Sequence, residues 1–290
     1  MSPINLVVQG SLLLLVFTVG LQGRFYDFLL VIRQPRLFLS GVLVVNVIVP
    51  IVAVLIVFLF PIALMTKAGL IAMAIAPMAP FLPGKMLKTG AGHEFAVGLY
   101  ATLIVTAILI VPASIWAVGA FTHREVDLPV GALAWFVFTT VLLPLLAGML
   151  VARLWPAIAP RLAKIGTIAA YVVLVPVVLF LLVKSGGELA GLLGDGTLAA
   201  IIITVLIGMV AGHALGGPEP VTRLAMSQAA VTRHPGIAGL IVQANGVDKA
   251  AMLAVILFLL VSLVLSTLYG KWILPRDAAA AARANGELQK

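Results

Sequence analysis

The sequence predicts an all-α polytopic membrane protein with nine transmembrane segments, arranged as inverted repeats with two discontinuous crossing helices. Of its 290 residues, 63% are hydrophobic and only 10% are charged, and the mean hydropathy is +1.23. A typical soluble domain has about 25% charged residues. Apolar stretches of about 20 residues, enough to cross a bilayer core of about 30 Å, also recur along the chain. These observations exclude a soluble enzyme, a disordered chain and a nucleic-acid-binding protein, although the pI is near 10.1.

Nine segments have the length and composition of membrane helices. They cover about residues 5–22, 37–63, 68–89, 95–121, 130–154, 168–183, 198–215, 221–242 and 250–274. Residues 1–274 therefore form one transmembrane domain. We expect a first repeat block at about 5–121 and a second at about 130–274, followed by an Ala-rich, charged cytoplasmic tail at 275–290.

Two of these segments cannot be regular helices. The first contains Pro77, Pro80 and Pro83, and each proline removes an N–H and clashes with an earlier carbonyl. The second contains Thr-Arg-His-Pro-Gly at 232–236, with Arg233 near the middle of the span. Non-helical backbone at this depth must be buried in protein or line a cavity. The alternative interpretation is that both segments are helices kinked at proline.

The interrupted segments occupy the same place in each half of the chain. This correspondence pairs 5–22 with 168–183, 37–63 with 198–215, 68–89 with 221–242, and 95–121 with 250–274, and it leaves 130–154 without a partner. The paired blocks have opposite orientation in the membrane. Such a pattern is typical of secondary transporters with inverted repeats, whose substrate site lies where two discontinuous helices cross.

The basic residues orient the chain with its N-terminus outside and its C-terminus in the cytoplasm, because cytoplasmic loops are rich in Lys and Arg. Thirteen of the 18 Lys and Arg residues fall on the cytoplasmic side in this orientation: Arg24, Arg33, Arg36, Lys85, Lys88, Arg153, Arg161, Lys164, Arg223, Lys271, Arg276, Arg283 and Lys290.

No sequence motif supports an enzyme. The chain has no cysteine, which excludes disulfides, thiolate metal sites and cysteine nucleophiles. It also has no zinc-protease, serine-hydrolase or phosphate-loop motif. Asp195 lies between two glycines and is typical of a turn. We therefore expect no catalytic residue, no bound metal and no cofactor.

Several stretches resemble the bile acid:sodium symporter family. They are the end of the first segment at 16–22, Tyr26-Asp27-Phe28, Gln34-Pro35-Arg36, Asn46 to Ala53, Lys88 to Gly92, and Arg223 with His234 to Ala238. The resemblance extends from about residue 11 to residue 272. It implies a transporter fold with a panel domain and a core domain, in which the first helix of the usual ten-helix layout is missing.

The family's sodium ligands are not all present. Its first crossover carries a Ser-Asn pair, whereas residues 77–84 here are Pro and apolar residues. The family's second crossover has a Glu where this chain has Gln228 or Ala229, and a Gln-Asn pair where it has Arg233 and His234. Hard cations bind to oxygen ligands, commonly with a carboxylate among them. Sodium coupling is therefore not expected.

Five residues are candidates for substrate binding: Arg233, His234, Gln228, Thr232 and Asn46. Arg233 would bind an anionic group, and the alternative is that it bonds backbone carbonyls. His234 would accept a proton, or be structural. If a cation does bind, its ligands would be Gln228, Thr102 and Asn46. Thr102 could instead bond its own helix, and Asn46 a carbonyl near Pro50.

The sequence thus predicts a secondary active transporter of a small or amphipathic organic anion that works by alternating access. The alternatives are a sodium-dependent symporter of the bile acid type, and an uncoupled channel or sensor with the same fold. Its partners would be the anion and the lipid bilayer, and not nucleic acid. We expect it in the inner (plasma) membrane of a bacterium.

Overall fold

The computed structural model describes residues 3–29, 33–122, 130–192, 194–244, 246 and 249–287. The protein is all-helical over these ranges, where the extended pairing consists of an isolated antiparallel bridge between Met78 and Arg233. This confirms the predicted all-α class.

The helices follow one another with short connections. The first half contains α1 (Pro3–Gln22), the 3-10 turn η1 (Phe25–Leu29), α3 (Pro35–Leu43), the π-helical turn η2 (Val44–Ile48), α4 (Val49–Leu59), α5 (Leu64–Ile75), α6 (Leu82–Lys88) and α7 (His93–Thr122). The second half contains α8 (Val130–Val137), the π-helical turn η3 (Phe138–Leu142), α9 (Leu143–Leu154), α10 (Ala159–Lys184), α11 (Gly186–Gly191), α12 (Thr197–Leu215), α13 (Pro220–Val231), α14 (Pro235–Ala244) and α15 (Lys249–Glu287).

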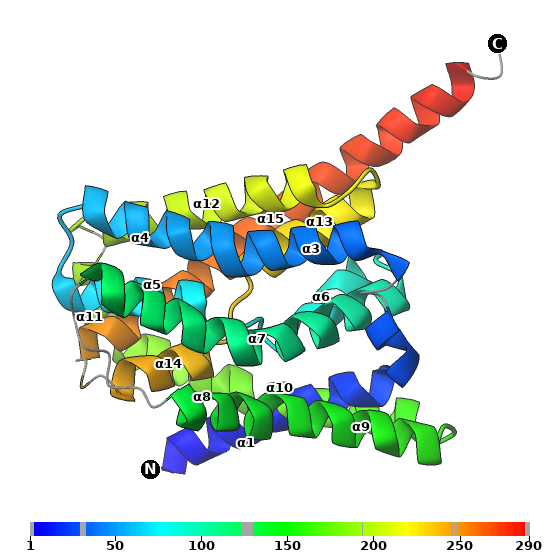
Figure 1. Ribbon diagram of the computed structural model, residues 1–290, viewed down its shortest axis with the longest axis horizontal. Coiled ribbons are helices and arrows are strands. Elements are labelled where there is room, and N and C mark those ends of the chain that lie inside the picture. The colour runs from blue at the N-terminus through cyan, green and yellow to red at the C-terminus, as the bar shows by residue number, and fades with distance from the viewer. Residues whose placement is uncertain are drawn as a thin grey trace.

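The bundle has two parts. Helices α1, α8, α9 and α10 lie together along the lower edge of Figure 1, and α1 packs against both α9 and α10. The remaining helices form the larger part, in which α12 packs against α4, α13 and α15, and α5 packs against α14 and α15. The helices at 35–59 and 197–215 thus belong with the two interrupted segments.

Glycines allow the closest helix crossing in the smaller part. A Cβ on Gly20 of α1 would lie 2.2 Å from the carbonyl oxygen of Leu145 in α9. A Cβ on Gly148 of α9 would lie equally close, at 2.2 Å, to the carbonyl oxygen of Phe17. Small residues of this kind let membrane helices pack backbone against backbone, where burial of apolar surface gives no net advantage over lipid.

Among the described residues, six helices are long and apolar enough to cross a membrane. They are Pro35–Leu59, His93–Ala117, Ala134–Leu154, Ala159–Lys184, Thr197–Leu215 and Lys249–Ile273. The other three predicted segments contain the shorter apolar helices Leu6–Gln22, Leu64–Ile75 and Pro235–Ala244. The nine-segment topology therefore stays a prediction.

Both predicted interruptions are present. Helix α5 ends at Ile75 and α6 begins at Leu82, and α13 ends at Val231 before α14 begins at Pro235. The structure thus has complete breaks at these places instead of proline kinks.

Among the helix boundaries that differ from the sequence prediction, three have a clear physical cause. The second segment ends at Leu59 and not near 63, because Phe60 adopts an extended conformation before Pro61. Helix α10 begins at Ala159 and not near 168, since Pro160 is well tolerated in a first helical turn. Helix α15 continues into the predicted tail as far as Glu287, where the alanines have the highest helix propensity. In Figure 1 this end of α15 projects away from the bundle.

Candidate functional site

The two helix breaks lie against each other. The N–H of Ala79 donates to the carbonyl of Thr232 at 3.0 Å, and the N–H of His234 donates to the carbonyl of Pro77 at 2.8 Å. These bonds flank the antiparallel bridge between Met78 and Arg233. Each break therefore supplies partners for backbone groups that the other has removed from a helix, which is necessary where no water is available.

Arg233 connects this crossing to a third segment. Its fully buried side chain donates three hydrogen bonds to backbone carbonyls. The Nε–H donates to Ala230 at 3.0 Å, Nη1 to Ala76 at 3.2 Å, and Nη2 to Val45 at 2.6 Å. The guanidinium thus holds together α13, the first break and the π-helical turn η2.

All three carbonyls lack a regular helical donor. The N–H of Val49 bonds Val44, and the next residue, Pro50, has no N–H to offer to Val45. Pro80, four residues after Ala76, has none either. The N–H of His234, four residues after Ala230, is bonded to Pro77 instead. Arg233 therefore satisfies three acceptors that would otherwise be unpaired.

These bonds agree with the alternative interpretation of Arg233, in which it pairs with backbone carbonyls. A guanidinium has five N–H groups, of which three are in use. Direct contact between Arg233 and a substrate stays a prediction, and it would require the other two.

His234 caps the helix that follows it. Its Nδ1 accepts a hydrogen bond from the N–H of Ile237 at 3.3 Å, and Pro235 occupies the first position of α14. A backbone N–H can only donate, so Nδ1 is an acceptor and the proton of the neutral ring lies on Nε2. Uptake of a second proton at Nδ1 would break this cap.

The remaining predicted residues point to different places. Thr102 donates to the carbonyl of Gly98 at 2.7 Å, as the alternative interpretation expected. Asn46 is buried beside Val45, and its Nδ2 has no partner among the described residues. Thr232 is buried, and its carbonyl accepts a hydrogen bond from the N–H of Ala79 in the first break.

Gln228 lies against α15, where a Cβ on Gly270 would be 3.8 Å from its Nε2. Over the described ranges no hydrogen bond joins Gln228, Thr102 and Asn46, so a cation site at these residues stays a prediction.

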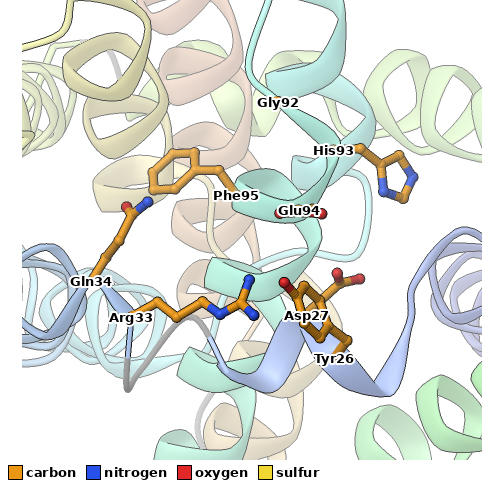
Figure 2. Close-up of a pocket in the computed structure, with 8 residues that line it drawn as sticks. All are labelled: Tyr26, Asp27, Arg33, Gln34, Gly92, His93, Glu94 and Phe95. Atoms are coloured by element: carbon orange, nitrogen blue, oxygen red, sulfur yellow. The ribbon is translucent and has the colours of Figure 1, made fainter.

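Sequence reasoning gave backbone carbonyls as the alternative partners of Arg233, but it did not find which carbonyls these are. The prolines at positions 50 and 80 were the available signal, since each leaves an earlier carbonyl without its helical donor. It also did not find a cavity of about 470 Å³ where α1 is followed by η1 and α3. Figure 2 shows its lining: Tyr26, Asp27, Arg33, Gln34, Gly92, His93, Glu94 and Phe95.

Asp27 is the buried charge of this cavity. Its Oδ2 accepts a hydrogen bond from the N–H of Arg24 at 2.7 Å, but Oδ1 has no partner among the described residues. Burial raises the pKa of the Asp27 carboxyl, and the Arg24 N–H opposes this rise. The Arg33 guanidinium lies over the Tyr26 ring, 3.9 Å from its centroid. Figure 2 shows Arg33 pointing toward Tyr26 and Asp27, and His93 pointing away.

A second cavity of about 750 Å³ adjoins the first and shares Arg33, Gln34, Gly92 and Phe95 with it. It extends past Arg36 to the connection between α12 and α13. The two cavities lie at one end of the bundle, where the chain passes from the smaller part to the larger.

The sequence profile of the Sodium Bile acid symporter family matches residues 11–192, which is more than half of the chain. This protein belongs to that family. The resemblance inferred from the motifs is thereby confirmed, and it identifies an integral membrane protein of a transporter family. The profile match ends before the second break, so Arg233 and His234 lie outside the matched residues. No curated protein matches the chain.

The raised pKa of Asp27 predicts a pH-dependent effect of its replacement. Asn keeps an acceptor for the N–H of Arg24 but removes the buried charge. A raised folded-state pKa means that the ionised carboxylate destabilises the fold at neutral pH, and that protonation relieves this cost as the pH falls. Asp27→Asn should therefore raise the melting temperature relative to wild type at pH 8, with a smaller difference at pH 4.5. A difference that does not change with pH would show that the buried charge has no energetic cost.

Proposed function

We propose that this protein is a secondary transporter that moves a small or amphipathic organic anion without a requirement for sodium. The observation that carries this proposal is at the crossing of the two broken helices. There the guanidinium of Arg233 bonds three carbonyls that have no regular helical donor. Carbonyl oxygens are also ligands for hard cations. Since Arg233 already supplies a positive charge to these oxygens, no cation has to bind before the anion does.

The helix order supports an inverted-repeat architecture with alternating access. Helix α1, the helix 35–59, the broken pair α5 and α6, and α7 come in the same order as α10, α12, the broken pair α13 and α14, and α15. The helix from α8 to α9 has no counterpart. In this arrangement the smaller part, with α1, α8, α9 and α10, is the panel, and the larger part rocks against it around the crossing.

The basic residues support an anionic substrate. Arg33, Arg36 and Glu219 line the 750 Å³ cavity at one end of the bundle, so its lining has two positive charges against one negative charge. A cleft with an excess of one sign of charge attracts ions of the opposite sign. In the proposed orientation this end is cytoplasmic, so the arginines would draw an anion from the cell interior.

The proposed direction of transport is outward. Importing one negative charge costs about 2.3 kcal/mol per 100 mV of inside-negative potential, and export gains the same amount. Proton coupling through His234 is the other option, but a second proton on its ring would break the cap on Ile237. Passive export down the potential needs no such change.

The decisive experiment is uptake and efflux of radiolabelled carboxylates by proteoliposomes, with sodium replaced by choline and at pH 6 and pH 8. We expect saturable flux that is unchanged without sodium and is driven outward by an inside-negative potential. A tenfold or greater loss without sodium would instead indicate a sodium symporter. Flux that does not saturate would indicate a channel. A strong dependence on the pH gradient would favour proton coupling through His234.

We also propose an orientation for the chain in a bacterial inner membrane. The positive-inside rule places the N-terminus outside and the end of α15 in the cytoplasm. The chain has no cysteine, so labelling of a single introduced cysteine has no background from other thiols. A cysteine at position 2, which lies outside the described residues, should react with an impermeant maleimide in intact cells, and one replacing Ala281 should react only after lysis. The reverse pattern would contradict the assigned topology.

A further inference from the structure

Lys85 is a partly buried basic residue in the larger part of the bundle. Lys85 lies on α6, directly after the first break, and its side chain is partly buried. Its amine donates a hydrogen bond to the Oγ of Ser266 on α15. The neighbouring basic residue on α6, Lys88, is exposed. The two lysines of this helix therefore have different environments.

The amine of Lys85 is not saturated by this contact. Ser266 is fully buried, and its hydroxyl donates in turn to the carbonyl of Ser262. An ammonium group has three N–H donors. Within the described part of the chain, the bond to Ser266 is the one hydrogen bond that the structure records for this amine. Two donors thus remain for another partner.

The side chain of Gln228 lies against α15, one helical turn from Ser266. It is 1% exposed, and neither its Oε1 nor its Nε2 has a hydrogen-bond partner among the described residues. Its Nε2 lies against Gly270. Gly270 follows Ser266 by four residues, so the two lie on one face of α15, about 6 Å apart along its axis. Buried amides without a partner are rare in folded proteins and costly, which points to a polar ligand.

We propose that Lys85, Ser266 and Gln228 form a binding site for the carboxylate group of the transported anion. The ammonium of Lys85 and the amide NH₂ of Gln228 would donate to the two carboxylate oxygens, and the hydroxyl of Ser266 would hold Lys85 in position. Arg233 has a different task, because its donors hold the backbone. This site rests on the proposed function, since it names the group that recognises the substrate.

The test is a thermal-shift measurement of the purified full-length protein with acetate, pyruvate, benzoate and cholate. Bound ligands raise the melting temperature by mass action. At least one of these carboxylates should stabilise the wild type. Lys85→Gln should weaken that carboxylate by about 10- to 100-fold in apparent Kd, the usual size for a lost charge-assisted hydrogen bond. Lys88→Gln is the matched control on the same helix and should bind as the wild type does.

Gln228→Leu is a second, independent variant for this measurement if Lys85→Gln does not fold. Removal of an unpaired buried amide should leave the ligand-free protein as stable as wild type or more stable, while the carboxylate shift is lost. An unchanged shift in either folded variant, or an equal loss in Lys88→Gln, overturns the site and leaves the transport proposal standing. If none of the four carboxylates stabilises the wild type, the transport proposal fails together with the site.

Discussion

The architecture depends on one constraint, that a polar backbone group inside a membrane protein must find a partner within the protein. Two helices break at the same depth, and a π-helical turn ahead of Pro50 disturbs a third. The breaks satisfy each other in part through two backbone hydrogen bonds. Three carbonyls still have no backbone donor, and the guanidinium of Arg233 donates a hydrogen bond to each of them. Its planar array of donors can serve acceptors from several directions, which an ammonium group on a flexible stem does less well.

This interaction also separates two tasks that a single cation could perform. A bound ion at a helix crossing can hold the backbone and attract an anion, but it leaves with each transport cycle. A guanidinium fixed to the chain holds the backbone permanently, so the crossing does not have to disassemble between cycles. In the proposed site the carboxylate is recognised by other groups, the partly buried amine of Lys85 and the unpaired amide of Gln228. The free energy for transport would come from the membrane potential acting on the anion itself.

The sequence predicted the helical class and the places of both breaks, because apolar length and proline have direct structural consequences. It also placed Arg233 at the centre of the second interrupted segment. It could not predict which atoms Arg233 would bond, since Val45 and Ala76 are distant in the chain and become acceptors only when three segments pack together. The capping role of His234 depends on the start of α14 at Pro235. The helical tail was missed because its charges suggested a solvated segment, although its alanines favour a helix.

The central claim, that Arg233 occupies the place of a cation, is tested most directly by removal of its side chain. In Arg233→Ala the three carbonyls lose their donor and become free to bind sodium. Sodium chloride, compared with choline chloride at equal ionic strength, should then raise the melting temperature of this variant by about 2 °C or more. Wild type should not respond, nor should Arg223→Ala, which removes a guanidinium bonded to the carbonyl of Gly217 outside the crossing. Stabilisation of the wild type by sodium, or no sodium response in Arg233→Ala, would contradict the account.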